Sequence, residues 1–129
     1  MKYRTAILSI ALFLGVVGVV ATPANAAESK AVHSMAAILL NFQHFPTDAD
    51  KQTLKQITED KSATKDERTV AQAILDVQHT PAAADKPKLE AIVNNDKADS
   101  SVKTLASIVL NLKHMPSDSD KEKLKALAT

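Results

Sequence analysis

The sequence predicts an all-α protein of three 35-residue helical hairpins, stacked as a short α-solenoid or packed as a compact six-helix array. Three copies of one pattern align without gaps, over about residues 29–60, 64–95 and 99–129. Within each copy apolar residues recur at helical spacing, and a His-x-Pro step divides the copy into two parts. A fixed period of this length is typical of helical repeat proteins, in which stacked units bury a continuous core.

Seven positions of the pattern carry the same residue in all three copies, which indicates an internal duplication. They are Ala36/Ala71/Ala106, Leu40/Leu75/Leu110, His44/His79/His114, Pro46/Pro81/Pro116, Asp50/Asp85/Asp120, Lys51/Lys86/Lys121 and Leu54/Leu89/Leu124. The repeated alanine predicts close helix packing, because a small side chain lets two backbones approach.

The first helix of each copy should begin after an N-cap residue that stands at the same position each time. These residues are Ser29, Thr64 and Asp99, and Thr64 with Glu67 has the spacing of a capping box. A wide apolar stripe follows, from Val32 to Phe42 in copy one and from Val102 to Leu112 in copy three. Such a stripe predicts a helix that packs on more than one side.

The His-x-Pro step ends this helix, because proline excludes the α conformation from the residue before it. Thr47 and Ser117 are then placed to cap the second helix of copies one and three. Copy two differs, since Ala82 cannot cap and Pro87 is tolerated only in a first turn. Its second helix should start near Asp85 and be shorter. The second helices carry narrow apolar stripes, which predicts surface helices that cover the first set.

The first 26 residues have the features of a cleaved signal peptide. A basic start precedes an apolar run over 6–21, and Ala24 and Ala26 form an A-x-A cleavage site. The run is short for a membrane span, so we expect cleavage after Ala26 and a soluble domain over 27–129, periplasmic or secreted. Without Lys2 and Arg4, the 16 Lys+Arg fall to 14, against 15 Asp+Glu. This near-neutral balance argues against nucleic acid or an anionic membrane surface as partner.

The lack of cysteine and of glycine outside the predicted signal peptide argues against several classes of enzyme. The chain has no cysteine, and both of its glycines, Gly15 and Gly18, lie in the predicted signal peptide. Phosphate-binding loops and nucleophile elbows depend on glycine, and no Ser–His–Asp spacing distinguishes a nucleophile from a cap. We therefore expect a non-catalytic protein without a cofactor.

The repeated histidines, His44, His79 and His114, are the candidates for a ligand or partner contact. Each could cap the end of a helix, bind a metal or haem, sense pH or contact a partner. In a stack, neighbouring helices lie about 8–10 Å apart and equivalent side chains point in parallel. His33 lies about 16 Å along the helix from His44. We therefore expect the three imidazoles not to converge on one ion, and expect no metal site; capping is the favoured interpretation.

Residues 100–116 resemble the first helix and turn of HEAT-type repeats, through Val102, Lys103, Ala106, Leu110 and Pro116. The chain departs from that pattern in having histidine where HEAT turns have glycine. The resemblance implies a scaffold that binds partner proteins and supplies no functional residues. We thus predict a small exported protein-binding or scaffold module, or alternatively a periplasmic ligand, metal or haem carrier that uses the His-x-Pro face. Self-association through uncovered terminal repeats is a further possibility.

Overall fold

The computed structural model describes residues 29–129, and this part of the chain consists of six α-helices and no strand. The helices are α1 (Lys30–Leu40), α2 (Asp48–Glu59), α3 (Lys65–Leu75), α4 (Lys86–Val93), α5 (Ser100–Leu110) and α6 (Asp118–Ala128). The predicted all-α class is confirmed, whereas the predicted signal peptide lies outside the described residues. None of the six helices has the length and hydropathy to cross a bilayer.

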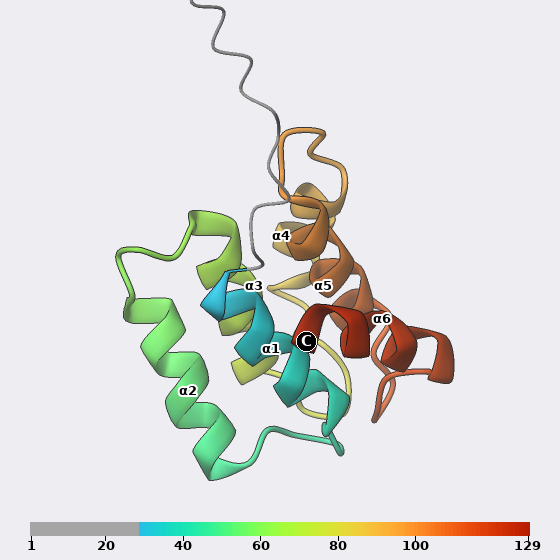
Figure 1. The fold of residues 1–129 in the computed structure, drawn as a ribbon. Coiled ribbons are helices and arrows are strands. Elements are labelled where there is room, and N and C mark those ends of the chain that lie inside the picture. Colours follow the sequence, from blue (N-terminus) through green and yellow to red (C-terminus); the bar gives the residue numbers. More distant parts are fainter. Residues whose placement is uncertain (1–28) are drawn as a thin grey trace, which may run out of the picture.

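The helices form an inner group of three and an outer group of three (Figure 1). The inner helices α1, α3 and α5 contact one another. Each outer helix packs chiefly on the inner helix of another copy: α2 on α3, α4 on α5 and α6 on α1. Contacts between the two helices of a single copy are less extensive. The packing therefore runs in a cycle that relates the three copies by an approximate threefold axis.

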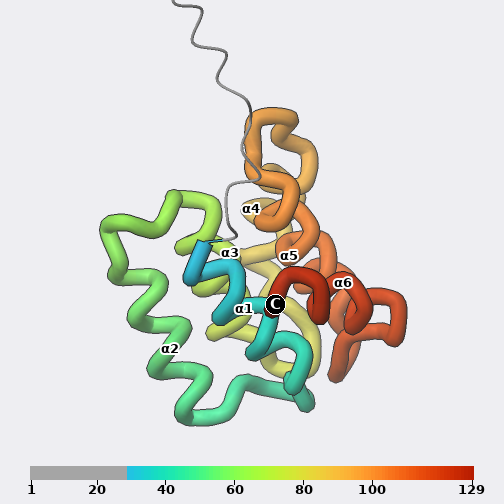
Figure 2. The backbone as a smooth tube through the Cα atoms, in the orientation of Figure 1, coloured from blue at the N-terminus to red at the C-terminus, as the bar shows by residue number. Residues whose placement is uncertain are grey.

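The packing of α6 on α1 joins the two ends of the described chain (Figure 2). Each of these terminal helices covers the apolar side of the other. The expectation of uncovered terminal repeats is therefore wrong, and self-association would have to use a different surface.

The core lies between the inner helices and beneath the outer ones. The outer helices contribute few buried side chains, among them the fully buried Leu54, Leu89 and Leu124. The inner helices contribute most of the rest, as their wide apolar stripes predict: Val32, Met35, Leu39, Val70, Ile74, Val102, Leu105 and Val109 are all at most 2% exposed. The repeated alanines Ala36, Ala71 and Ala106 are completely buried. The small residue thus lies entirely within the core in all three copies.

Short connections explain why an outer helix covers the next inner helix. Between α2 and α3 the Asp60 carboxylate accepts hydrogen bonds from the Ser62 hydroxyl at 2.7 Å and the Ser62 amide at 2.8 Å. These donors lower the pKa of Asp60. Asn95 accepts from the Lys97 amide at 3.0 Å in the matching connection between α4 and α5. Such tight turns bring consecutive helices back against each other.

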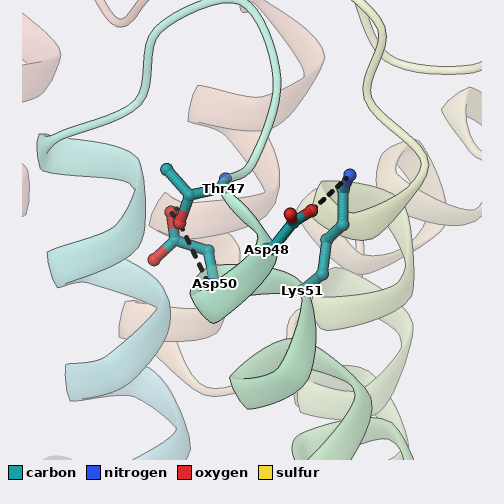
Figure 3. Close-up of polar contacts among 4 residues, drawn as sticks. All are labelled: Thr47, Asp48, Asp50 and Lys51. Atoms are coloured by element: carbon teal, nitrogen blue, oxygen red, sulfur yellow. Dashed lines mark hydrogen bonds and ion pairs between the residues drawn. The ribbon is translucent and has the colours of Figure 1, made fainter.

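The predicted N-caps of the inner helices and of α2 and α6 are all present. In α2 the Asp50 amide donates to the Thr47 hydroxyl oxygen at 3.2 Å, and the Thr47 amide donates to the Asp50 carboxylate at 3.1 Å. Figure 3 shows this capping box, with Asp48 and Lys51 pointing toward each other in an ion pair of 3.4 Å. The local sequence therefore determines where these helices begin.

The second helix of copy two is shorter, as the sequence predicts. It spans eight residues from Lys86, and its N-cap residue Asp85 makes no side-chain cap hydrogen bond. Pro87 stands in its first turn, where the missing N–H removes no helical hydrogen bond. The Asp85 carboxylate is instead paired with Lys88 at 3.0 Å.

Replacing a repeated alanine by a larger residue should destabilise the fold at the buried position only. Ala36 is completely buried and the adjacent Ala37 is exposed on the same helix. We expect Ala36→Leu to lower the free energy of unfolding by about 1–3 kcal/mol through overpacking, and Ala37→Leu to change it by less than about 0.5 kcal/mol. Urea unfolding of both variants measures this difference. Equal effects would contradict close packing at Ala36.

Removal of the α2 cap should cost about 1 kcal/mol of stability. Thr47→Ala leaves the Asp50 amide without its acceptor, and the typical loss for such a change is about 0.5–2 kcal/mol. Thr53 lies half-buried in the interior of the same helix, and its hydroxyl donates to the Ala49 carbonyl. Thr53→Ala should be neutral or slightly stabilising, because alanine has the higher helix propensity. Thermal unfolding compares the two variants. A larger loss of stability for Thr53→Ala than for Thr47→Ala would refute Thr47 as the N-cap of α2.

Candidate functional site

The inner helices end without help from the histidines. At the end of α1 the backbone N–H of Asn41 donates to the carbonyl oxygens of Ala37 and Leu39, and its side-chain amide donates to Ala37 at 3.1 Å. The Phe42 N–H also donates to Leu39. Asn111 ends α5 in the same way. Within the described residues no histidine ring bonds to a helix carbonyl, so the capping interpretation of the histidines is wrong.

Each His-x-Pro turn is held at both ends by buried apolar residues. In copy one Phe42 precedes the turn and Pro46 follows it, and both are buried. The pairs Val77 with Pro81 and Leu112 with Pro116 are buried at the same positions. His44, between its two anchors, is exposed. The sequence thus presents one imidazole at the outer tip of each anchored turn.

The three histidines share a backbone conformation that is unusual for a residue with a Cβ atom. Their φ angles are 62° for His44, 67° for His79 and 65° for His114, and they are the positive-φ residues of the described chain. The Phe45 N–H donates to the Gln43 carbonyl at 2.6 Å, closing a three-residue turn of the γ type around His44. A non-glycine residue in this region costs on the order of 1–3 kcal/mol and persists only where the surroundings enforce it.

A closed ring of backbone hydrogen bonds holds the three histidines in this conformation. The N–H of His44 donates to the carbonyl oxygen of His114 at 2.8 Å, that of His79 to His44 at 2.9 Å, and that of His114 to His79 at 2.7 Å. Each histidine therefore donates to one copy and accepts from another. This ring lies where the three turns meet on the approximate threefold axis.

The imidazoles converge as well, which the sequence analysis did not expect. Ring centroids lie 5.3 Å apart for His44 and His79, and 5.2 Å apart for the two pairs that include His114. The expectation of parallel, separated side chains assumed copies related by translation along a stack. The copies are instead related by rotation about an axis, so equivalent residues point to a common centre. We call His44, His79 and His114 the histidine triad.

The triad has the geometry of a three-nitrogen metal site. The Nδ1 atoms of His44 and His114 are 3.2 Å apart, and one potential ligand nitrogen from each ring lies within 4.8 Å of the other two. Two nitrogens on one tetrahedral ion, with bonds of about 2.0–2.1 Å, would be separated by about 3.3 Å. The His44–His114 separation matches this value, and ring rotation would have to bring the nitrogen of His79 to the same distance. No other His, Cys, Asp or Glu cluster of this kind occurs in residues 29–129.

Two imidazoles of the triad are close enough to form a hydrogen bond with each other. In the close His44–His114 pair one ring donates its Nδ1 hydrogen and the other accepts it. The nearby acidic residues of the following helices are used elsewhere: Asp50 caps α2, and Asp48 pairs with Lys51. One metal ion could be ligated by one nitrogen from each of the three rings at once.

The surface around the triad is partly apolar. The residue after each histidine is exposed, and Phe45 and Met115 are 59% and 47% accessible. They are the exposed large hydrophobic residues of the described chain. A groove of about 340 Å³ lies between the turns of copies one and two, and Pro46, Leu75 and Val77 line it together with His79. We call the exposed surface of the triad, Phe45 and Met115 the triad face.

One sequence signal pointed to this site but was interpreted differently. Histidine recurs at one position of each turn, and glycine is the residue that most readily accepts the positive φ angle found there. Histidine at all three positions therefore carries a conformational cost that glycine would avoid. No family model, curated protein or solved structure matches the chain.

The positive φ angle predicts an unusual ranking of substitutions at His79. His79→Gly and His79→Val both remove the imidazole, but glycine accepts a φ of 67° and a β-branched residue does not. We expect the valine variant to be about 1–2 kcal/mol less stable than the glycine variant in chemical unfolding. A valine variant as stable as the glycine variant would contradict this backbone conformation.

Proposed function

We propose that the protein binds a divalent transition-metal ion through the imidazoles of His44, His79 and His114. The observation that supports it is the convergence of one potential ligand nitrogen from each of the three copies within 4.8 Å. The strained turns add support, because the chain keeps histidine at three positions where glycine or asparagine would cost less. Backbone strain of this kind is concentrated at binding sites.

Three imidazole nitrogens suit a divalent transition-metal ion better than they suit Mg²⁺ or Ca²⁺. Imidazole favours Zn²⁺, Cu²⁺, Ni²⁺ and Fe, whereas Mg²⁺ and Ca²⁺ prefer oxygen ligands. Three nitrogen ligands leave at least one coordination position open on a four-coordinate ion. We propose a carrier or binding role for this site rather than catalysis, in an exported protein, with the signal peptide over residues 1–26 as the basis for export.

Binding to a partner protein is the second candidate. Phe45 and Met115 are the exposed large hydrophobic residues of the described chain, and both lie next to the triad. Exposed apolar side chains at one place favour a protein contact. The non-catalytic scaffold role implied by the resemblance to HEAT repeats would use this same surface. A partner captured equally well with and without a chelator would favour this candidate over metal binding.

Metal titration of the purified, untagged protein tests the proposal. We expect saturable uptake of Zn²⁺ or Ni²⁺ in calorimetry. At free metal about 100 times Kd the folded state should gain about 2.7 kcal/mol, which raises Tm by several degrees in a domain of about 100 residues.

The variants for this test keep the backbone conformation. Asparagine tolerates positive φ, so His44→Asn/His79→Asn/His114→Asn should fold and lose the metal-dependent rise in Tm. His33 on α1 lies outside the triad, and His33→Asn should bind as the unmodified protein does. Equal metal uptake by the triple variant and the unmodified protein would refute the triad as the ligand set.

A further inference from the structure

We propose that two copies of this chain share one metal ion face to face, so that six imidazoles surround it. This inference rests on the proposed metal binding and names the partner that completes the site. Its starting point is the number of ligands. The triad supplies three nitrogens and, within residues 29–129, no further His, Cys, Asp or Glu joins the cluster.

The triad is open to such a partner. His44, His79 and His114 are all exposed, so an ion bound to them has free coordination positions that face outward. Three ligands around a threefold axis occupy one triangular face of an octahedron. An identical triad, turned over by a twofold axis, would supply the opposite face. The closed, isologous dimer is the commonest form of homo-oligomer.

The apolar residues of the triad face fit the same arrangement. Octahedral coordination requires the two triads to be staggered by half of the threefold spacing. One of the three staggered registers places the third turn of one copy, which carries Met115, opposite the gap between the first and second turns of the other. That gap holds the groove of about 340 Å³, and its lining combines apolar residues such as Phe45, Leu75 and Val77 with the polar Lys51 and Gln78. Met115 is 47% exposed and would enter it from each side.

The near-neutral charge of the chain permits two copies to approach each other. The contact between them is small, so the dimer should depend on the bound ion. Residues 27–129 carry 14 Lys+Arg against 15 Asp+Glu, so long-range repulsion between copies is weak. A stable interface without metal typically buries about 1,200–2,000 Å² in total, whereas one Phe side chain supplies about 150–250 Å². The dimer should therefore form with the metal and dissociate when the metal is removed.

Light scattering coupled to size exclusion, with Co²⁺ or Zn²⁺ added stepwise to the untagged full chain, tests the inference. We expect a twofold rise in mass that is complete at one ion per two chains and is reversed by EDTA. Six-coordinate Co²⁺ absorbs weakly in the visible region and four-coordinate Co²⁺ absorbs strongly, so the spectrum reports the ligand number independently. The expected spectrum is the weak one.

Phe45→Ser/Met115→Ser separates the dimer from metal binding. This variant keeps all three ligands, and we expect it to bind Co²⁺ as a monomer or with a dimer dissociation constant raised at least tenfold. Gln52→Ser/Lys55→Ser changes two exposed residues of α2 and should dimerise as the unmodified protein does.

The remaining outcomes would overturn the inference in distinguishable ways. One ion per monomer with strong Co²⁺ absorption would refute the shared ion and leave the proposed metal binding intact. Absence of metal uptake would refute both. A dimer that persists in EDTA, or that forms in the triple His→Asn variant, would show an interface that does not depend on the triad.

Discussion

The covering of each inner helix by an outer helix from another copy is the constraint on which the structure depends. The inner helices carry apolar stripes too wide to be buried against one neighbour. Tight connections at Asp60 and Asn95 direct α2 and α4 onto the following inner helix. The first inner helix has no preceding outer helix within the described chain, and α6 covers it. This last contact relates the copies by rotation, and it brings three turns to one point.

Where the three turns meet, the backbone is strained, and contacts elsewhere in the fold hold it in that conformation. Each histidine of the triad adopts a φ angle above 60°, which costs on the order of 1–3 kcal/mol for a residue with a Cβ atom. Burial of Phe42 and Pro46 on either side, and of their counterparts, fixes the path of the backbone. The ring of three backbone hydrogen bonds then gives every histidine N–H a partner from another copy. Local strain is thus balanced by interactions between copies that are distant in sequence.

Rotational repetition converts a single residue per copy into a cluster of three. Each copy contributes one histidine to the triad, and the sequence contains no Glu-x-x-His or His-Glu-x-x-His pattern. The cluster arises because the same turn is placed three times around an axis, with ring centroids at nearly equal distances of 5.2–5.3 Å. Repeat proteins that form an open stack separate such residues by the width of a helix. The chemistry of the site is therefore a consequence of how the copies are arranged.

The sequence by itself determined the elements of this protein. Apolar spacing, N-caps such as Thr47 and Thr64, and the shift of α4 to Lys86 are local effects, because they depend on side chains within a few residues of the helix ends. The sequence also singled out His44, His79 and His114 as the residues to examine. Only the tertiary structure decided that they converge, since the pairing of α6 with α1 depends on contacts between residues far apart in the chain. The positive φ angles likewise follow from hydrogen bonds between copies, which no local pattern encodes.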